Sequence, residues 1–293
     1  MKRLKGIVPV LVTPVNSNGS LDIEGLRNLI EYYNNEKVTG LWVLGTGGED
    51  MGLSFDQRLE VTKTVVQHAD PEIKLVVGCS FYSVQESFNF IRETSNMKFD
   101  AYHAMPYHPK VSNSLIIEWY KKLAANSSKP FWAYTSGNWA QNITPEMIKQ
   151  IKNIDAFEGV KYSTSNSVDL QSVSYLNSDN FQVISAVIKT YFYALCLGLE
   201  ATTSVEATCF LTDIRKIETA YNNGNILAAR DLQMQLNARL AYPSTASKDN
   251  FLRVAELKYM ISKSIDIEFS MTKYYRDLHD NEKAELDQYL NSL

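Results

Sequence analysis

Residues 157–163, Phe-Glu-Gly-Val-Lys-Tyr-Ser, read as a short buried strand with one lysine near its carboxyl end. Alternate side chains of a strand share a face, so Lys161 lies on the same face as Gly159 and Ser163. Glycine at position 159 then leaves an empty volume beside the lysine. Burial disfavours an ammonium ion and lowers the pKa of a lysine by up to about 3–5 units. The neutral amine attacks carbonyl carbon and forms a Schiff base. The alternative is a strand-end lysine whose head reaches solvent.

Three other segments carry groups that suit this chemistry. Tyr134 belongs to a predicted strand, and a tyrosine hydroxyl can carry protons when a threonine hydroxyl such as that of Thr46 assists it. Residues 45–49 form a glycine-rich turn whose consecutive N–H groups can hold a keto-acid carboxylate. Tyr107 and His108 follow another predicted strand. Taken singly, each signal has an ordinary explanation: core packing for tyrosine, capping for threonine and a tight turn for the glycines.

Strand-like and helix-like segments alternate along most of the chain. The predicted strands are 6–13, 40–45, 74–80, 101–107, 130–135, 157–163, 181–187 and 201–207, and predicted helices include 21–37, 54–68, 112–126, 144–153 and 167–177. This alternation predicts parallel βαβ units, and eight of them fit a (β/α)₈ TIM barrel. An open doubly wound sheet is disfavoured because no glycine-rich phosphate turn follows the first predicted strand.

Three further helical segments, 225–241, 248–262 and 281–290, follow the barrel without an obvious linker. We therefore expect a (β/α)₈ barrel over residues 1–223 and a C-terminal helical extension of the same domain over residues 224–293. In barrel enzymes the reacting groups lie at the carboxyl ends of the strands. The candidate residues named above occupy such ends of the second, fourth, fifth and sixth predicted strands.

Composition excludes several classes of function. The 293 residues carry a formal net charge of -4 with acids and bases interspersed, so neither a nucleic-acid surface nor a polybasic membrane patch is expected. Pro9 interrupts the apolar run near the N-terminus, which is too short for a signal peptide or a membrane span, so a cytoplasmic protein is expected. Cys79, Cys196 and Cys209 are expected to be reduced core residues. No metal-ligand spacing, GxGxxG or Walker motif occurs, so neither metal nor cofactor is expected.

The chain resembles the family of pyruvate-dependent class I aldolases that includes N-acetylneuraminate lyase and dihydrodipicolinate synthase. The most specific matches are residues 45–49, Gly-Thr-Gly-Gly-Glu, which are similar to the family's G-[ST]-T-G-E, and residues 159–161, Gly-Val-Lys, which are similar to its G-[IV]-K. Pro106 and Tyr107 are similar to the start of its P-Y-Y turn, and Tyr134 matches its catalytic tyrosine. The resemblance covers nearly the whole chain.

This resemblance implies a role for each matching residue. Lys161 would form an imine with pyruvate, Tyr134 would transfer protons, and Thr46 would be the relay partner of that tyrosine. The amides of Gly47 and Gly48 would hold the pyruvate carboxylate. The partners implied are pyruvate and an aldehyde or its keto-acid adduct. Members of the family are commonly homotetramers, built as dimers of dimers.

Several positions depart from the family pattern. Gly47 stands where members usually have a second hydroxyl residue, and His108 replaces a tyrosine that reaches into the neighbouring subunit's site. Trp139 occupies the position of the arginine with which the synthase binds the carboxylate of aspartate semialdehyde. Ala186 lies at a strand end that is usually glycine-rich and polar, and Thr203 falls where a main-chain carbonyl lies close to bound pyruvate.

The favoured interpretation is a Schiff-base aldolase or lyase that acts on pyruvate and an aldehyde other than aspartate semialdehyde. An indole such as that of Trp139 cannot imitate a bidentate carboxylate clamp, which argues against the synthase. The alternatives are the synthase itself, or a barrel that has lost catalysis and serves a binding or regulatory role. A metal-dependent aldolase is disfavoured because the ligand set is missing.

Overall fold

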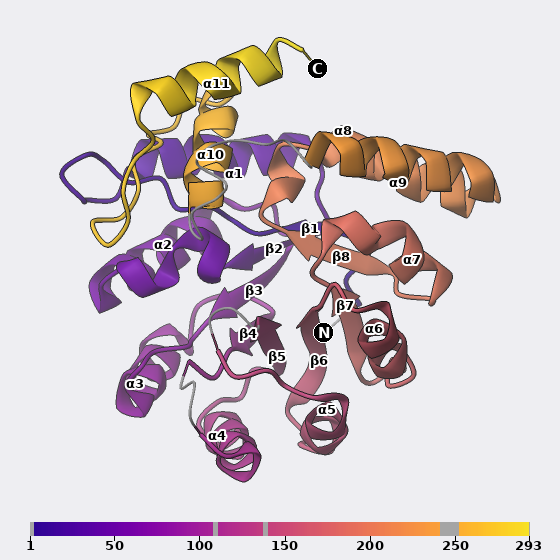
Figure 1. Cartoon of the computed structure of the whole chain (residues 1–293). Coiled ribbons are helices and arrows are strands. Elements are labelled where there is room, and N and C mark those ends of the chain that lie inside the picture. Colours follow the sequence, from indigo (N-terminus) through magenta and orange to yellow (C-terminus); the bar gives the residue numbers. More distant parts are fainter. Residues whose placement is uncertain (1–2, 108–110, 137–139, 241–251, 293) are drawn as a thin grey trace.

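The computed structural model describes residues 3–107, 111–136, 140–240 and 252–292. Its eight parallel strands form one sheet in the order β1-β8-β7-β6-β5-β4-β3-β2 (Figure 1). The strands are β1 (Gly6–Pro9), β2 (Gly40–Val43), β3 (Lys74–Gly78), β4 (Ala101–Ala104), β5 (Phe131–Ser136), β6 (Phe157–Ser163), β7 (Gln182–Ser185) and β8 (Ala201–Ser204). A parallel bridge between Val10 and Trp42 brings the two edges together. The predicted (β/α)₈ barrel is confirmed.

A ring of helices surrounds the strands. It consists of α1 (Ile23–Asn35), α2 (Phe55–His68), α3 (Val84–Thr94), α4 (Asn113–Ala125), α5 (Pro145–Lys152), α6 (Ser167–Ser174), α7 (Tyr191–Cys196) and α8 (Leu211–Asn222). Short 3₁₀ helices, η1 (Thr46–Gly48), η2 (Asp50–Gly52), η3 (Ile188–Thr190) and η4 (Glu206–Thr208), follow β2, β7 and β8. Most predicted strands extend past the observed carboxyl ends, because these residues form the turns that carry the site.

The space expected beside Gly159 is filled. A Cβ atom at this position would lie 2.7 Å from Cζ3 of Trp132 and 2.5 Å from the carbonyl oxygen of Gln182. Trp132 and Trp42 are both buried, and their rings meet edge to face with centroids 6.3 Å apart. The prediction of an empty volume is therefore wrong. Glycine is required here because an indole from the neighbouring strand packs against the main chain.

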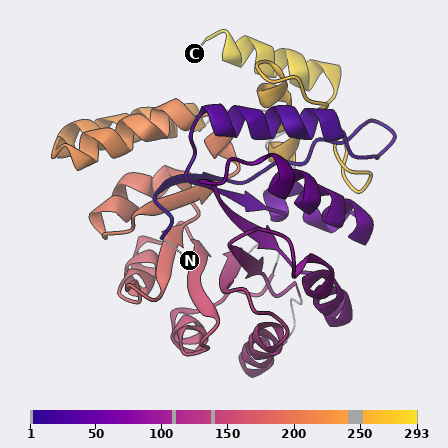
Figure 2. The ribbon, with the colours of Figure 1, turned by 180° about the vertical axis from the view of Figure 1, so that it is seen from behind.

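The N-terminal segment closes the end of the barrel at which the strands begin. Figure 2 shows this segment crossing the end from which the strands start. The Leu4 side chain is buried with the inward-facing residues of the strands. Its main chain exchanges two hydrogen bonds with the Gln182 amide, at 2.9 and 2.6 Å. The barrel interior is thus sealed on one side and accessible on the side where the strands end.

The C-terminal helices are joined to the barrel by a buried ion pair. Helices α9 (Ile226–Leu240), α10 (Leu252–Ser262) and α11 (Asp280–Leu290) follow α8. Lys258 of α10 donates to Glu49 at 2.7 Å, and neither side chain is accessible to solvent. The other Glu49 oxygen accepts the N–H of Thr272 at 2.7 Å. One carboxylate therefore ties the turn after β2 to two separate parts of the extension.

Three findings concern the expectations from composition. Cys79 is buried and Cys209 is half-buried, but Cys196 is exposed, so its expected place in the core is wrong. Within the described residues, no helix has the length and apolar character that crossing a membrane requires. Across the same residues, no group of three or more His, Cys, Asp or Glu side chains is arranged to hold a metal ion.

We expect Lys258→Met to lower the free energy of unfolding by about 3–5 kcal/mol, because it leaves the Glu49 carboxylate buried without its cation. Chemical denaturation followed by circular dichroism measures this change. Lys63→Met is the control, since the Lys63–Glu60 pair is exposed and such pairs contribute at most about 1 kcal/mol. A loss no larger than that of the control would contradict a buried, coupled pair.

Candidate active site

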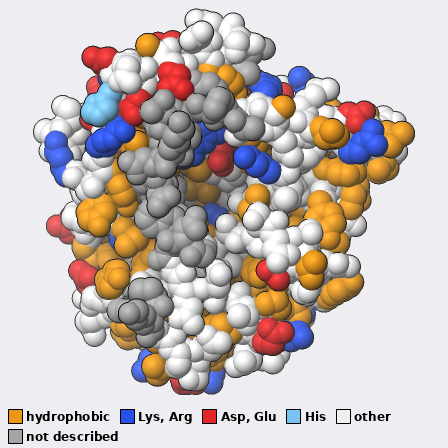
Figure 3. Space-filling view, in the orientation of Figure 1, with side chains coloured by type: hydrophobic (Ala, Val, Ile, Leu, Met, Phe, Trp, Pro, Cys, Tyr) orange, Lys and Arg blue, Asp and Glu red, His pale blue; other side chains and the backbone are white. Residues whose placement is uncertain are grey.

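Lys161 lies inside the mouth of the barrel. It is paired in register with Tyr134 of β5, and its side chain is only 4% exposed. The Nζ atom lies 4.3 Å from the centroid of the Tyr134 ring and 4.9 Å from that of a Trp42 ring. The alternative in which the lysine head escapes to solvent is therefore wrong. Figure 3 shows that the surface is hollowed near the centre of this face of the molecule.

Burial makes the lysine a nucleophile near neutral pH. Desolvation lowers the pKa of Lys161 to about 7, although the carboxylates of Glu206 and Asp50 oppose this shift. His103 stacks on Trp42 with ring centroids 4.3 Å apart, and its Nε2 lies 2.9 Å from the Val43 carbonyl. Burial holds the pKa of His103 well below its usual value. The ring is therefore neutral, with its proton on Nε2, and adds no charge beside the amine.

A hydroxyl pair stands next to the amine. Tyr134 and Thr46 are 3.0 Å apart, oxygen to oxygen, and either can be the donor. Burial raises the pKa of Tyr134 to about 12, and hydrogen bonds from Thr46 and Ser136 limit the rise. The phenol is therefore protonated at neutral pH. It can give a proton to a developing oxyanion and recover one through the threonine.

The turn after β2 offers main-chain donors. The Gly48 N–H already donates to the Gly45 carbonyl at 2.8 Å. For the N–H groups of Thr46 and Gly47, the described residues provide no backbone acceptor. A Cβ at Gly47 would lie 3.0 Å from Val205 and 3.1 Å from Val10, so methyl groups close the space that a side chain would need. The turn therefore offers backbone N–H groups, and no side chain at position 47, to a ligand.

A second buried pair was not anticipated from the sequence. The Tyr107 hydroxyl donates to Asp50 at 2.5 Å, and the Arg58 guanidinium lies 3.9 Å from the same carboxylate. The other oxygen of Asp50 is buried, and the described residues give it no hydrogen-bond partner. Burial raises the pKa of this carboxyl group. The sequence feature that could have indicated Asp50 is its position directly after the glycine-rich motif.

The remaining predicted residues divide into two groups. Thr203 is fully buried in β8, and its hydroxyl lacks a hydrogen-bond partner among the described residues. Ala186 is half-buried just after β7, where its N–H donates to the Tyr162 carbonyl at 3.0 Å. The predicted residues His108 and Trp139 lie outside the described residues.

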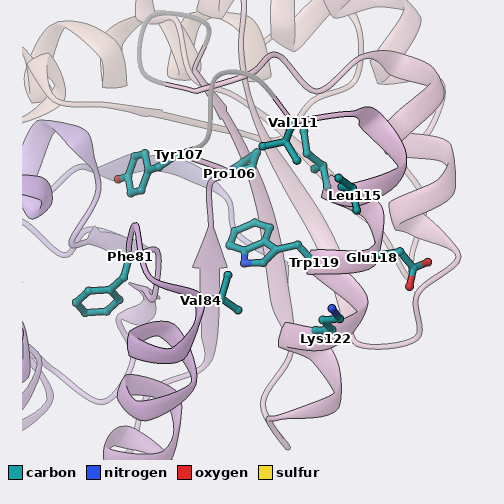
Figure 4. Close-up of a pocket in the computed structure, with 10 residues that line it drawn as sticks. Phe81, Val84, Pro106, Tyr107, Val111, Leu115, Glu118, Trp119 and Lys122 are labelled. Atoms are coloured by element: carbon teal, nitrogen blue, oxygen red, sulfur yellow. The ribbon is translucent and has the colours of Figure 1, made fainter.

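An apolar groove of about 240 Å³ lies between α3 and α4, to one side of the site. Figure 4 shows Val84 and Trp119 on its walls, with the Tyr107 hydroxyl directed away from Trp119. Glu118 and Lys122 are the charged members of its lining. Since its walls are mostly apolar and Lys161 is not among its lining residues, this groove is not the place where a keto acid reaches the amine.

The fold and the site together define a class of enzyme. A lysine with a pKa of about 7, beside a phenol and a threonine hydroxyl at the mouth of a (β/α)₈ barrel, is the arrangement of a Schiff-base, class I aldolase. The model of the Dihydrodipicolinate synthetase family matches residues 3–261. The chain belongs to this family.

Relatives and solved structures agree with the assignment. The chain is 27% identical to the 4-hydroxy-tetrahydrodipicolinate synthase of Teredinibacter turnerae over 234 residues, which covers 79% of this chain and 80% of the relative. A dihydrodipicolinate synthase from Bacteroides thetaiotaomicron has a TM-score of 0.91 and 26% identity over 99% of both chains. N-acetylneuraminate lyase from Mycoplasma synoviae has a TM-score of 0.87 at 18% identity, over 99% of this chain and 98% of that chain. This last likeness concerns the fold.

The low pKa of Lys161 predicts a distinctive pH profile of reactivity. Its reductive methylation by formaldehyde should level off above about pH 7, because the amine is then already neutral. Below this pH the rate should fall about tenfold per pH unit as the ammonium forms. Peptide mass spectrometry reads this rate for each lysine. A short unstructured lysine peptide, with the ordinary lysine pKa of about 10.4, is the control and should still be accelerating at pH 9; a matching profile at Lys161 would contradict the low pKa.

Proposed function

We propose that the protein is a class I aldolase or lyase that condenses pyruvate with an aldehyde, or releases pyruvate from the corresponding keto-acid adduct. The observation that carries this proposal is the neutral Nζ of Lys161 enclosed beside the Tyr134–Thr46 hydroxyl pair. The family assignment supports it independently. A lysine placed there for structure alone would be costly to bury.

In the proposed reaction, Lys161 attacks the keto carbon of pyruvate, and the carbinolamine loses water to give an imine. Loss of a proton from the methyl carbon yields an enamine, which forms a carbon–carbon bond with the aldehyde. Water then hydrolyses the imine and restores the amine. Tyr134 supplies and recovers protons at the oxygen atoms, and Thr46 relays them. Cleavage is the same sequence in reverse.

The pyruvate carboxylate is assigned to the turn after β2. Both Gly47 and Gly48 are assigned to this carboxylate site, but they contribute to it in different ways. The Gly47 N–H is available as a donor together with that of Thr46, whereas the Gly48 N–H already supports the turn. A Cβ at Gly48 would lie 2.7 Å from the Leu11 carbonyl, so glycine permits the close approach that shapes the turn.

Further assignments follow the family resemblance. The main-chain carbonyl of Thr203 is assigned to the neighbourhood of bound pyruvate, and its fully buried position in β8 is compatible with this. Ala186 and Trp139 are assigned to the aldehyde side of the site. His108 is assigned the passing of a proton in place of the family's second tyrosine.

The larger organisation is also proposed. The glutamate–lysine pair between Glu49 and Lys258 supports treating residues 1–223 and 224–293 as one domain with a helical extension. A homotetramer built as a dimer of dimers is proposed from the resemblance alone, and a cytoplasmic location is proposed from the sequence. Light scattering on the purified chain tests the tetramer, since the monomer mass is 33.2 kDa.

A second candidate is the synthase reaction with aspartate semialdehyde. It is favoured by the relatives at 26–27% identity, whose names are those of synthases. The presence of Trp139 in place of an arginine opposes it. Supplying pyruvate with aspartate semialdehyde and determining the product mass distinguishes the two candidates.

Lys161→Ala should abolish turnover and the trapping of pyruvate by borohydride, because no other amine lies beside the Tyr134–Thr46 pair in the described part of the chain. Intact-protein mass spectrometry detects the reduced pyruvate adduct. Lys63→Ala is the control, since it removes an exposed lysine of α2 and should leave the adduct in place. Trapping that persists in Lys161→Ala would assign the nucleophile to another lysine.

Tyr134→Phe should lower kcat by about 10²–10⁴, the usual contribution of a positioned proton donor. The pyruvate adduct at Lys161 should still accumulate at long incubation, since the amine itself is unchanged. Steady-state kinetics and adduct mass separate these two effects. Thr46→Val is the companion variant and should show a smaller loss. If Tyr134→Phe loses less than about tenfold, the phenol is not the proton donor.

A further inference from the structure

A carboxylate that the proposed reaction does not yet use lies at the carboxyl end of β8. It belongs to Glu206, which begins η4 directly after Val205. The Val205 side chain packs against the inward-facing residues of the strands, and a Cβ at Gly47 would lie 3.0 Å from it. The segments that follow parallel strands meet at one end of a barrel, which here is the end that holds Lys161. Glu206 therefore stands beside a wall of the candidate active site.

The Glu206 carboxylate is held through both of its oxygen atoms. The Ser204 hydroxyl donates to Oε2, and the oxygen of that hydroxyl accepts the N–H of Glu206 at 3.2 Å. Nε of Arg253, from α10, lies 3.8 Å from Oε1. Only about a quarter of either charged side chain is exposed. The negative charge is thus fixed in place and partly shielded from solvent.

Arg253 neutralises this charge only in part. Its Nη1 lies 3.0 Å from the carboxylate of Glu256, which has no exposure to solvent, so one guanidinium serves two carboxylates. The closer of the two contacts is the one with Glu256. The Cys209 thiol is the other titratable group near Glu206, and burial raises its pKa to about 12, so it stays neutral. The cluster therefore keeps an excess of negative charge.

This charge acts on the amine of Lys161. Burial lowers the pKa of Lys161, and within the described part of the chain Glu206 is the strongest of the charges that oppose this effect. Asp50 acts in the same sense, but burial raises the pKa of its carboxyl group and Arg58 lies 3.9 Å from it. His103 is neutral and adds no charge. Glu206 is thus the principal carboxylate that stabilises a cation at this nitrogen.

We propose that Glu206 is the counter-ion of the protonated imine that Lys161 forms with the keto acid, and that Arg253 limits its strength. This inference rests on the proposed function. The carbinolamine hydroxyl leaves as water with a proton from Tyr134, and the phenol recovers a proton from solvent. The nitrogen keeps its own hydrogen and becomes a cation, which then accepts the electron pair when the methyl carbon loses its proton. Glu206 transfers no proton and acts as a positioning residue through its charge.

Glu206→Gln tests the proposal, because it removes the charge and keeps the size. Reductive methylation of Lys161 should reach half its maximal rate about one pH unit lower, the small end of the range for loss of a nearby opposite charge. Exchange of the pyruvate methyl hydrogens in D₂O, which needs no aldehyde, follows the imine by proton NMR. Its rate at saturating pyruvate should fall about tenfold, since one pKa unit is a tenfold change in the stability of the cation.

Glu200→Gln is the matched control. Glu200 directly precedes β8, at the other end of the same strand, where it pairs with Arg3 at 2.6 Å. This change should alter neither the methylation profile nor the exchange rate. Arg253→Gln should move the methylation profile to higher pH, because Glu206 then acts without its cation. Opposite shifts in the two variants are not expected from a lost structural contact.

The outcomes separate this inference from the proposed function. An unchanged methylation profile in Glu206→Gln, with pyruvate still trapped at Lys161, overturns the counter-ion alone. A profile that Arg253→Gln moves to lower pH overturns it as well. Glu206→Gln decides by itself if Arg253→Gln does not fold. The absence of pyruvate trapping in the unaltered protein overturns the proposed function and, with it, the counter-ion.

Discussion

The chemistry depends on keeping one amine away from water. Lys161 is held between Trp42 and Tyr134, and the cost of charging it there outweighs the attraction of the Glu206 and Asp50 carboxylates. The outcome is a pKa of about 7 in place of 10.5. A wholly apolar surrounding would lower the pKa of Lys161 further, and it would not stabilise a protonated imine. The two opposed effects therefore produce an amine that is both a nucleophile and a recoverable base near neutral pH.

The hydroxyl pair depends on a turn that distant residues hold in place. Thr46 begins this turn, and Glu49 ends it in the left-handed region with φ 56°. Such a conformation is uncommon for a residue with a side chain. The carboxylate of Glu49 is fixed through both oxygens, by Lys258 and by the Thr272 N–H. The C-terminal extension thus holds the end of the turn that begins at Thr46.

Local pattern was sufficient to predict the strands and the candidate lysine, because both depend on alternation along one segment. The local pattern did not predict that Trp132, from the neighbouring strand, fills the space beside Gly159. No property of residues 157–163 reveals that neighbour. The local pattern also failed at the Asp50–Tyr107 pair, which joins residues 57 positions apart.

The polar groups around the mouth of the barrel favour one orientation of the proposed substrate. At the turn after β2, Val205 and Val10 fill the space beside Gly47, so a carboxylate bound there, as proposed, would meet main-chain donors and no side chain at that position. The keto carbon then lies toward Lys161 on β6. Ser136 and Ser163 continue the inward face of β5 and β6 beyond Tyr134 and Lys161, so in the proposed reaction the far end of the substrate would pass these two side chains.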